Sequence, residues 1–185
     1  MAIKVQYNKT AMQQLRKALG VRERALPTLQ AKESALRVEV KKARDIVEKI
    51  DVQLDEKRRA LGQTHRMWNE FPSNLVEISN VAMHARKIAG VKTPILDSID
   101  FSLHPFSLFS APSWLPEGVE LLKEMVSLEI EKRIAQKSLE ILEYARKKTT
   151  QKVNLYEKVQ IPEYQEAIRK IKRFLEDEEN LAKSS

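Results

Sequence analysis

The stretch that decides the fold is residues 153–179, which reads VNLYEKVQIPEYQEAIRKIKRFLEDEE. Its apolar side chains recur at alternating steps of three and four residues, at Ile161, Tyr164, Ile168, Ile171 and Leu175. Side chains at this spacing lie along one side of an α-helix. The stripe is narrow, which is typical of a helix that packs along a seam against a second helix. The sequence therefore predicts a partner helix of matching length.

The first third of the chain supplies this partner. A four-three repeat runs from residue 12 to residue 61, and twelve of its fifteen positions are apolar. The repeat comprises Met12, Leu15, Leu19, Arg22, Leu26, Leu29, Glu33, Leu36, Val40, Ala43, Val47, Ile50, Leu54, Lys57 and Leu61. Such regularity predicts a left-handed coiled coil. Thr10 and Gln13 form a capping box that is predicted to begin the helix, and Pro27 is predicted to kink it.

A second long helix is predicted to begin at Pro116 and Glu117, because proline and an acid both suit the first turn. Its seam runs from residue 121 to residue 156, and eight of the eleven positions are apolar. The eight are Leu121, Met125, Leu128, Ala135, Leu139, Leu142, Val153 and Tyr156. A step of five residues then leads to Ile161, next to Pro162. This step predicts a local change of supercoil or a bend.

The middle of the chain, residues 65–116, has a different character and holds five of the seven prolines. Residues 74–87 are predicted to form a short helix capped by Asn74 and Glu77. Val91–Leu103 is predicted to form a short, edge-type β-hairpin around Pro94. The aromatic side chains of the middle form either an exposed docking patch or a small core of their own. They are Trp68, Phe71, Phe101, Phe106, Phe109 and Trp114.

The predicted fold class is mainly all-α: a long antiparallel two-helix coiled coil with a small knob of mixed helix and β-hairpin. It is one elongated domain, residues 1–185, with a first coiled-coil helix at 8–64, the central knob at 65–116 and a second coiled-coil helix at 117–182. Each helix would be roughly 80–100 Å long at about 1.5 Å per residue. Only 4 glycines occur, which favours long uninterrupted helices.

Composition excludes several kinds of site. The chain has no cysteine, which excludes disulfides, cysteine-ligated zinc and thiol catalysis and suits a reducing cytoplasm. The first residues, MAIKVQYNKT, lack the apolar core of a signal peptide, and no run approaches the ~18 apolar residues of a membrane span. His65, His84 and His104 are widely spaced, and no glycine-rich phosphate loop occurs. We therefore expect no metal, no cofactor and no catalytic residue set.

Charge is uneven along the chain. The formal net charge is +7, and residues 1–66 carry 16 Lys and Arg against 8 Asp and Glu. This basic arm is compatible with nucleic acid, an anionic membrane or an acidic protein wall as its partner. Two general functions stay open on this basis: a basic coiled-coil protein associated with nucleic acid, and a helical adaptor between proteins.

A further set of residues carries a family resemblance. Residues 152–157, KVNLYE, precede Ile161 and Pro162 and a helix that ends in the acidic run 175–179, LEDEE. Together they resemble a segment of the D subunit, the central rotor shaft of the vacuolar/archaeal-type (V/A-type) rotary ATPases. Residues 26–36 and the Gly-Val-x-x-Pro step at 90–94 are similar to its first helix and its middle. The lysine at 152 stands where the family prefers arginine, as in a divergent bacterial form.

The resemblance implies a non-catalytic central-stalk subunit that couples ATP hydrolysis or synthesis to H⁺ or Na⁺ transport by rotation. It implies three partners: the catalytic hexamer of A and B subunits, the small F subunit of the stalk, and the funnel-shaped subunit on the proteolipid ring. The expected location is cytoplasmic and peripheral, within a membrane-bound complex. We expect partner contacts at the hexamer from Arg16, Arg22, Arg24, Lys170, Arg173 and Lys183. At the knob we expect them from Trp68, Phe101, Phe106 and Trp114.

Overall fold

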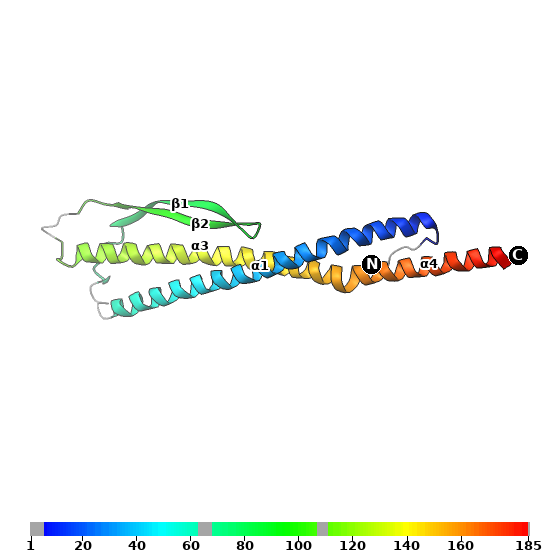
Figure 1. The fold of residues 1–185 in the computed structure, drawn as a ribbon. Coiled ribbons are helices and arrows are strands. Elements are labelled where there is room, and N and C mark those ends of the chain that lie inside the picture. Colours follow the sequence, from blue (N-terminus) through cyan, green and yellow to red (C-terminus); the bar gives the residue numbers. More distant parts are fainter. Residues whose placement is uncertain (1–5, 63–67, 107–110, 185) are drawn as a thin grey trace. The chain divides into compact units, whose positions relative to one another are not determined.

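The computed structural model describes residues 6–62, 68–106 and 111–184 of the chain. The elements are α1 (Lys9–Gly62), β1 (Val76–Ile88), β2 (Val91–Leu103), α3 (Leu115–Asn154), the π-helical turn η1 (Leu155–Gln160) and α4 (Ile161–Ser184) (Figure 1). The last three follow one another without a break. His65, Phe109 and the predicted boundary at residues 64–65 lie outside the described part. The chain divides into two compact units: unit 1 comprises Met1–Leu36 with Ala145–Ser185, and unit 2 comprises Arg37–Tyr144.

Both long helices were predicted, although the residues at which they begin differ slightly from the prediction. Helix α1 begins at Lys9, and the Asn8 side chain caps it by accepting a hydrogen bond from the backbone N–H of Ala11 at 2.6 Å. The predicted capping box of Thr10 and Gln13 is therefore wrong. The cap is Asn8, two residues before Thr10, whose side chain accepts a hydrogen bond from a free N–H group of the first turn. Helix α3 begins at Leu115, which puts Pro116 in its first turn as expected.

Unit 1 contains an antiparallel helix pair. Contacts from α1 to the carboxy-terminal helix run in opposite directions along the two sequences: Glu33 to Thr150, Glu23 to Gln165 and Lys9 to Glu179. Leu36, Val153, Ala167 and Ile171 are buried. Every predicted seam position of both helices in this unit is buried or half-buried, so the seam prediction is confirmed.

The π-helical turn η1 accounts for the five-residue step in the second seam. The N–H of Ile161 donates to the carbonyl of Tyr156, a separation of five residues instead of four. One extra residue in the turn moves the seam to its new positions, so the predicted change of register is confirmed. Pro162 explains the location: its ring would clash with the carbonyl four residues earlier in a regular α-helix, and the wider turn makes room.

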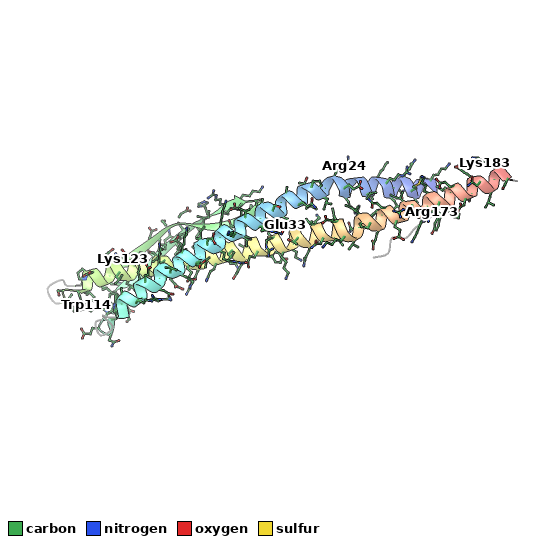
Figure 2. All side chains as sticks on the ribbon, turned by 60° about the horizontal axis from the view of Figure 1, so that its bottom comes forward. Arg24, Glu33, Trp114, Lys123, Arg173 and Lys183 are labelled. Atoms are coloured by element: carbon green, nitrogen blue, oxygen red, sulfur yellow. The ribbon has the colours of Figure 1, made fainter. Side chains whose placement is uncertain are left out.

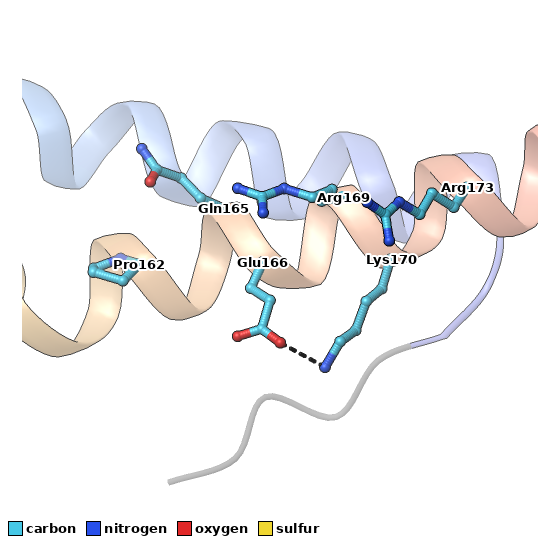
Figure 3. A pocket seen from close by; sticks show the side chains of 6 residues that line it. All are labelled: Pro162, Gln165, Glu166, Arg169, Lys170 and Arg173. Atoms are coloured by element: carbon cyan, nitrogen blue, oxygen red, sulfur yellow. Dashed lines mark ion pairs between the residues drawn. The ribbon is translucent and has the colours of Figure 1, made fainter.

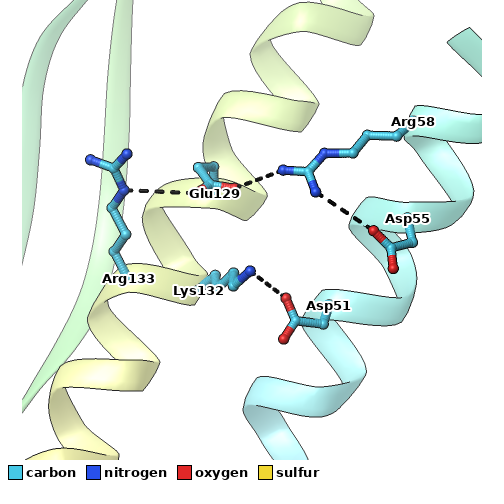
Figure 4. Close-up of polar contacts among 6 residues, drawn as sticks. All are labelled: Asp51, Asp55, Arg58, Glu129, Lys132 and Arg133. Atoms are coloured by element: carbon cyan, nitrogen blue, oxygen red, sulfur yellow. Dashed lines mark hydrogen bonds and ion pairs between the residues drawn. The ribbon is translucent and has the colours of Figure 1, made fainter.

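Unit 2 contains a second antiparallel helix pair, formed by residues 37–62 of α1 and residues 115–144 of α3. Leu54 and Leu142 are almost completely buried in it. Ion pairs link the two helices (Figure 4). Lys132 Nζ lies 2.5 Å from Asp51 Oδ1, and Arg58 lies between Asp55 on its own helix and Glu129 on α3, at 3.6 and 3.5 Å.

The middle of the chain forms a β-hairpin, in which β1 and β2 pair antiparallel from Val76↔Leu103 to Ile88↔Val91. The predicted helix at residues 74–87 is wrong, because this segment is almost entirely β1. Asn74 and Glu77 imitate a helix cap, and pairing with β2 overrides that local signal. The predicted hairpin at Val91–Leu103 is one strand of it, so both strands are longer than expected.

The turn of the hairpin consists of Ala89 and Gly90, with φ angles of 49° and 82°. Two consecutive residues with positive φ are typical of a type I′ turn, whose twist suits a two-residue hairpin connection. Glycine adopts this conformation freely, whereas the Cβ of Ala89 makes it unfavourable there by about 1 kcal/mol. The hairpin contacts α3 through Ser138, whose hydroxyl donates to the carbonyl of Pro94 at 2.7 Å.

Candidate partner-binding surfaces

Unit 1 displays most of the basic residues that the sequence analysis expected at a partner. Arg16, Arg24, Lys170, Arg173 and Lys183 are all exposed. Figure 2 shows Arg24 on α1 and Arg173 and Lys183 on α4. The Nε of Arg24 donates to the backbone carbonyl of Gly20 at 3.0 Å, which leaves the rest of its guanidinium to solvent. These residues hold their cations on long stems in solvent.

Arg22 is placed differently from the other predicted contacts. It is half-buried in the seam between α1 and the π-helical turn. Its Nε donates to Gln160 Oε1 at 2.8 Å, its Nη1 donates to the carbonyl of Ala18 at 2.9 Å, and its guanidinium carbon lies 4.5 Å from the ring centroid of Tyr164. The structure therefore brings Arg22 together with residues of its own unit. A lone arginine in an apolar seam was the only sequence signal for this contact.

Helix α4 carries a basic face beside Pro162. A shallow hollow of about 360 Å³ lies here, lined by Pro162, Gln165, Glu166, Arg169, Lys170 and Arg173 (Figure 3). Lys170 Nζ lies 2.8 Å from Glu166 Oε1. This hydrogen bond and the lysine charge lower the pKa of Glu166, and Glu166 raises the pKa of Lys170 in the same way. Both groups face solvent, so the pair contributes little to stability.

The aromatic residues of unit 2 gather mainly into a core of their own. Trp68 stacks on Phe71 with ring centroids 5.4 Å apart, and Trp114 lies 6.2 Å from Trp68. Trp114, Phe71 and Phe106 pack against the buried residues Leu75, Leu115 and Val119. A Cβ on Gly118 would lie 3.0 Å from Cζ3 of Trp114, which shows how closely the helix approaches this ring. Phe101 lies apart from the cluster, half-buried on β2 opposite Ile78.

A groove between the hairpin and the two helices of unit 2 was not foreseen from the sequence. Its volume is about 700 Å³, and residues of α1, β1, β2 and α3 line it. The apolar lining includes Ile46, Ile88, Ile95, Leu96 and Ile134. Its charged lining residues are Glu39, Lys42, Arg86, Lys87, Asp97 and Glu131. The groove depends on the fold of residues 76–88 as a strand, whereas the sequence analysis predicted a helix at residues 74–87.

His84 on β1 and His104, directly after β2, each pair with one carboxylate of the opposite segment. His84 Nδ1 lies 2.6 Å from Asp97 Oδ1, and His104 Nε2 lies 3.3 Å from Glu77 Oε1. Within the described ranges, no three His, Asp or Glu side chains converge as metal ligands. No helix in this part of the chain is long and apolar enough to cross a membrane.

Two antiparallel helix pairs and a β-hairpin inserted between the long helices in the sequence define a mainly helical protein with charged outer faces. The chain belongs to the ATP synthase D subunit family, whose model matches residues 11–184.

Curated relatives agree with this assignment along nearly the whole chain. The V-type ATP synthase D subunit of Borreliella burgdorferi is 29% identical over 181 residues, which cover 97% of this chain and 90% of the relative. The protein of the same name from Chlamydia pneumoniae is 29% identical over 182 residues, 96% of this chain and 87% of the relative. The protein of the same name from Chlamydia abortus is 28% identical over 183 residues, which cover 96% of this chain and 88% of the relative. The resemblance found in the sequence is thus confirmed.

Proposed function

We infer that this chain is the central-stalk subunit of a V-type ATP synthase, where it couples ATP hydrolysis or synthesis to H⁺ or Na⁺ transport by rotating as a shaft. The observation that carries this inference is the family match over residues 11–184. Relatives that bear the name of the V-type ATP synthase D subunit, covered over 87–90% of their length, support the same reading. They favour it over a nucleic-acid-associated coiled coil or a general helical adaptor.

The helix pairs have properties that suit a shaft. Some polar residues within the seams form hydrogen bonds or ion pairs with the opposite helix, as Arg22 does with Gln160 and Lys132 with Asp51. A polar residue in a seam specifies register, because sliding leaves it without its partner. The helices therefore resist moving past one another under load. We propose that the subunit itself is non-catalytic and transmits motion through these pairs.

We propose that unit 1 faces the catalytic hexamer of A and B subunits through Arg16, Arg24, Lys170, Arg173 and Lys183. Each exposed ion pair contributes only about 0–1 kcal/mol. Contacts of this strength are easily exchanged, which suits a rotor that meets different subunits in turn. The other proposed partners are the small F subunit of the stalk and the funnel-shaped subunit on the proteolipid ring. The complex would place the chain on the cytoplasmic side, peripheral to the membrane.

The test is purification of the affinity-tagged full chain from its own cells. We expect the A, B and F subunits and the funnel-shaped subunit to co-purify, and we expect membrane vesicles without the chain to lose ATP-driven ion uptake. Return of the purified chain should restore uptake. A tagged chain that purifies without any ATPase subunit would contradict the proposal. Steeply salt-dependent binding to DNA or RNA would then support the nucleic-acid alternative.

A further inference from the structure

The β-hairpin has two outer edges, and the surroundings of these edges differ. On β2, Thr93 is buried and the three residues that follow it are half-buried. The carbonyl of Pro94 accepts a hydrogen bond from the hydroxyl of Ser138, so the edge of β2 faces α3. On β1, every residue from Met83 to Lys87 is exposed. The outer edge of β1 is therefore the one that is open to solvent along this stretch.

The strand register identifies the backbone groups that point outward from β1. Ile88 and Val91 flank a two-residue turn, so they form a hydrogen-bonded pair, and hydrogen-bonded pairs alternate with open ones from there along the strands. Ala85 and Pro94 thus form an open pair, which agrees with the direction of the Pro94 carbonyl toward α3. The residues whose N–H and C=O groups point away from β2 are Met83, Ala85 and Lys87. These backbone groups form no hydrogen bond with any described residue.

The regular part of this edge is short. The register shifts between Ile78 and Asn80 and again between Ala82 and Met83, so the undisturbed ladder runs from Met83 to Ile88. At about 3.4 Å per residue this stretch is about 17 Å long, which is the length of a common β-strand. Bulges protect a sheet edge against unlimited pairing. Here they leave one regular stretch that has room for a single short strand.

The charges on this stretch disfavour a second copy of the same chain. Arg86 and Lys87 are both exposed, and two copies paired edge to edge would bring both cations of each copy together along about 17 Å. Like charges close to one another across paired strands are destabilising. The formal net charge of +7 on each chain adds a repulsion at longer range. A different protein is therefore the better partner for this edge.

We propose that the edge of β1 from Met83 to Lys87 binds an extended segment of another protein, which adds to the hairpin as a third strand. The backbone of this segment would exchange hydrogen bonds with Met83, Ala85 and Lys87. Its side chains would contact Met83, which is 55% exposed, and Ala85 on the same face. Strand addition is a common mode of peptide recognition in which main-chain hydrogen bonds supply the affinity. The proposal rests on the proposed function only in that another subunit of the complex is the expected source of the segment.

The chemistry of the edge distinguishes a polypeptide from other partners. N–H donors and C=O acceptors point outward together at every second residue, about 6.8 Å apart. An extended backbone presents the matching acceptors and donors at the same spacing. A phosphate group of a nucleic acid accepts hydrogen bonds but has no donors for the three carbonyl groups, and a lipid tail offers neither.

Amide hydrogen exchange tests the proposal without any variant. The purified full chain and the assembled complex are exchanged in parallel, and mass spectrometry with electron-transfer fragmentation gives the rate of each amide in the hairpin. In the free chain the outward amides of Met83, Ala85 and Lys87 should exchange fast, and the inward amides of His84 and Arg86 slowly. In the complex we expect the outward amides to slow about tenfold or more. Outward amides that stay fast in the complex, or that slow in the free chain as its concentration rises, would overturn the proposal.

Ala85→Pro supplies the second measurement. Proline removes an outward N–H and puts its ring where the added strand would lie, yet it breaks no bond to β2. In the complex we expect the amides of Met83 and Lys87 to return to their free-chain rates, while those of His84 and Arg86 stay slow. The matched control, Ala85→Thr, keeps the N–H and suits a strand, so it should retain the protection.

Equal protection in the proline and threonine variants would overturn the proposal, because side-chain contact would then be the cause of the slow exchange. Faster exchange at His84 and Arg86 would show that proline disturbs the hairpin itself. The measurement on the unaltered chain then decides alone.

The outcome separates this inference from the proposed function. A chain that joins the other ATPase subunits but keeps fast outward amides refutes the strand addition alone. A chain that joins none of them counts against the proposed function. Exchange is then measured in the assembly with which the tagged chain purifies from its own cells. Fast outward amides in that assembly, or a chain that purifies alone, would overturn the strand addition as well.

Discussion

Replacing Arg22 by alanine is expected to destabilise the helix pair of unit 1 by about 2–3 kcal/mol. The hydrogen bond from its guanidinium to Gln160, at 2.8 Å, accounts for about 1.5 kcal/mol as a bond from a charged group. The contact with the Tyr164 ring, at 4.5 Å, adds about 0.5 kcal/mol at a partly exposed position. The half-buried aliphatic stem adds about 1 kcal/mol, at about 0.8 kcal/mol for each fully buried methylene.

Arg22→Met separates the polar part of this energy from the packing. Methionine keeps an unbranched stem and a similar helix propensity, so we expect a loss of about 0.5–1.5 kcal/mol. Arg24→Ala is the matched control, because Arg24 is exposed and its Nε bonds to the carbonyl of Gly20 on its own helix. We expect it to change the free energy of unfolding by less than about 0.5 kcal/mol.

Urea unfolding of the full chain measures these differences. Far-UV circular dichroism detects the helices of both units, whereas Trp68 and Trp114, the only two tryptophans, both report on unit 2. The Arg22→Ala variant should therefore shift the transition seen by circular dichroism. A cost below about 0.5 kcal/mol, equal to that of Arg24→Ala, would refute the reasoning. It would mean that Arg22 stabilises the helix pair no more than an exposed arginine does.

Three further outcomes are expected. Ile171→Ala, at a fully buried seam position, should cost about 2–5 kcal/mol in urea unfolding, whereas Leu181→Ala, at a 70% exposed position, should be nearly neutral. Ala89→Gly should stabilise the hairpin by about 1 kcal/mol, seen as slower amide exchange in both strands, and unchanged exchange would contradict the strained turn. Lys170→Met should raise the lowered pKa of Glu166 toward its ordinary value in a carbon-13 NMR titration. The native pair stabilises the fold above the ordinary carboxyl pKa, and its effect disappears as pH falls through the lowered value.

The helices were predictable because their signal is local and repeated. Seam residues such as Leu36, Leu54 and Ile171 recur at fixed spacing in the sequence, and they become buried once two such helices pack together. The five-residue step before Ile161 likewise indicated a change of register, although spacing alone does not distinguish a bend from a π-helical turn. Pro162 adds the physical reason, since it excludes the regular α-helical geometry at that point.

The hairpin was predictable only in part, because its register depends on residues far apart in the sequence. Residues 76–88 contain few consecutive β-branched side chains, and Asn74 with Glu77 looks like a helix cap. Only the pairing with β2 decides between the two structures. The pairing of Lys87 with Lys92 was missed for the same reason, because these two residues become neighbours only when the strands pair.

The polar residues that interrupt the seams are the features whose meaning changes most once the fold is known. In the sequence they look like flaws in a coiled coil, yet four of them form a hydrogen bond or an ion pair with a residue of the opposite helix. The four pairs are Arg22 with Gln160, Glu33 with Thr150, Lys57 with Glu124 and Lys132 with Asp51. A slip of one heptad, about 10 Å along a helix, would preserve apolar contacts but separate all four pairs. Each half-buried group left without a partner costs about 1–3 kcal/mol, so the apolar seam supplies adhesion and the polar interruptions determine the register in which each helix pair can bear load.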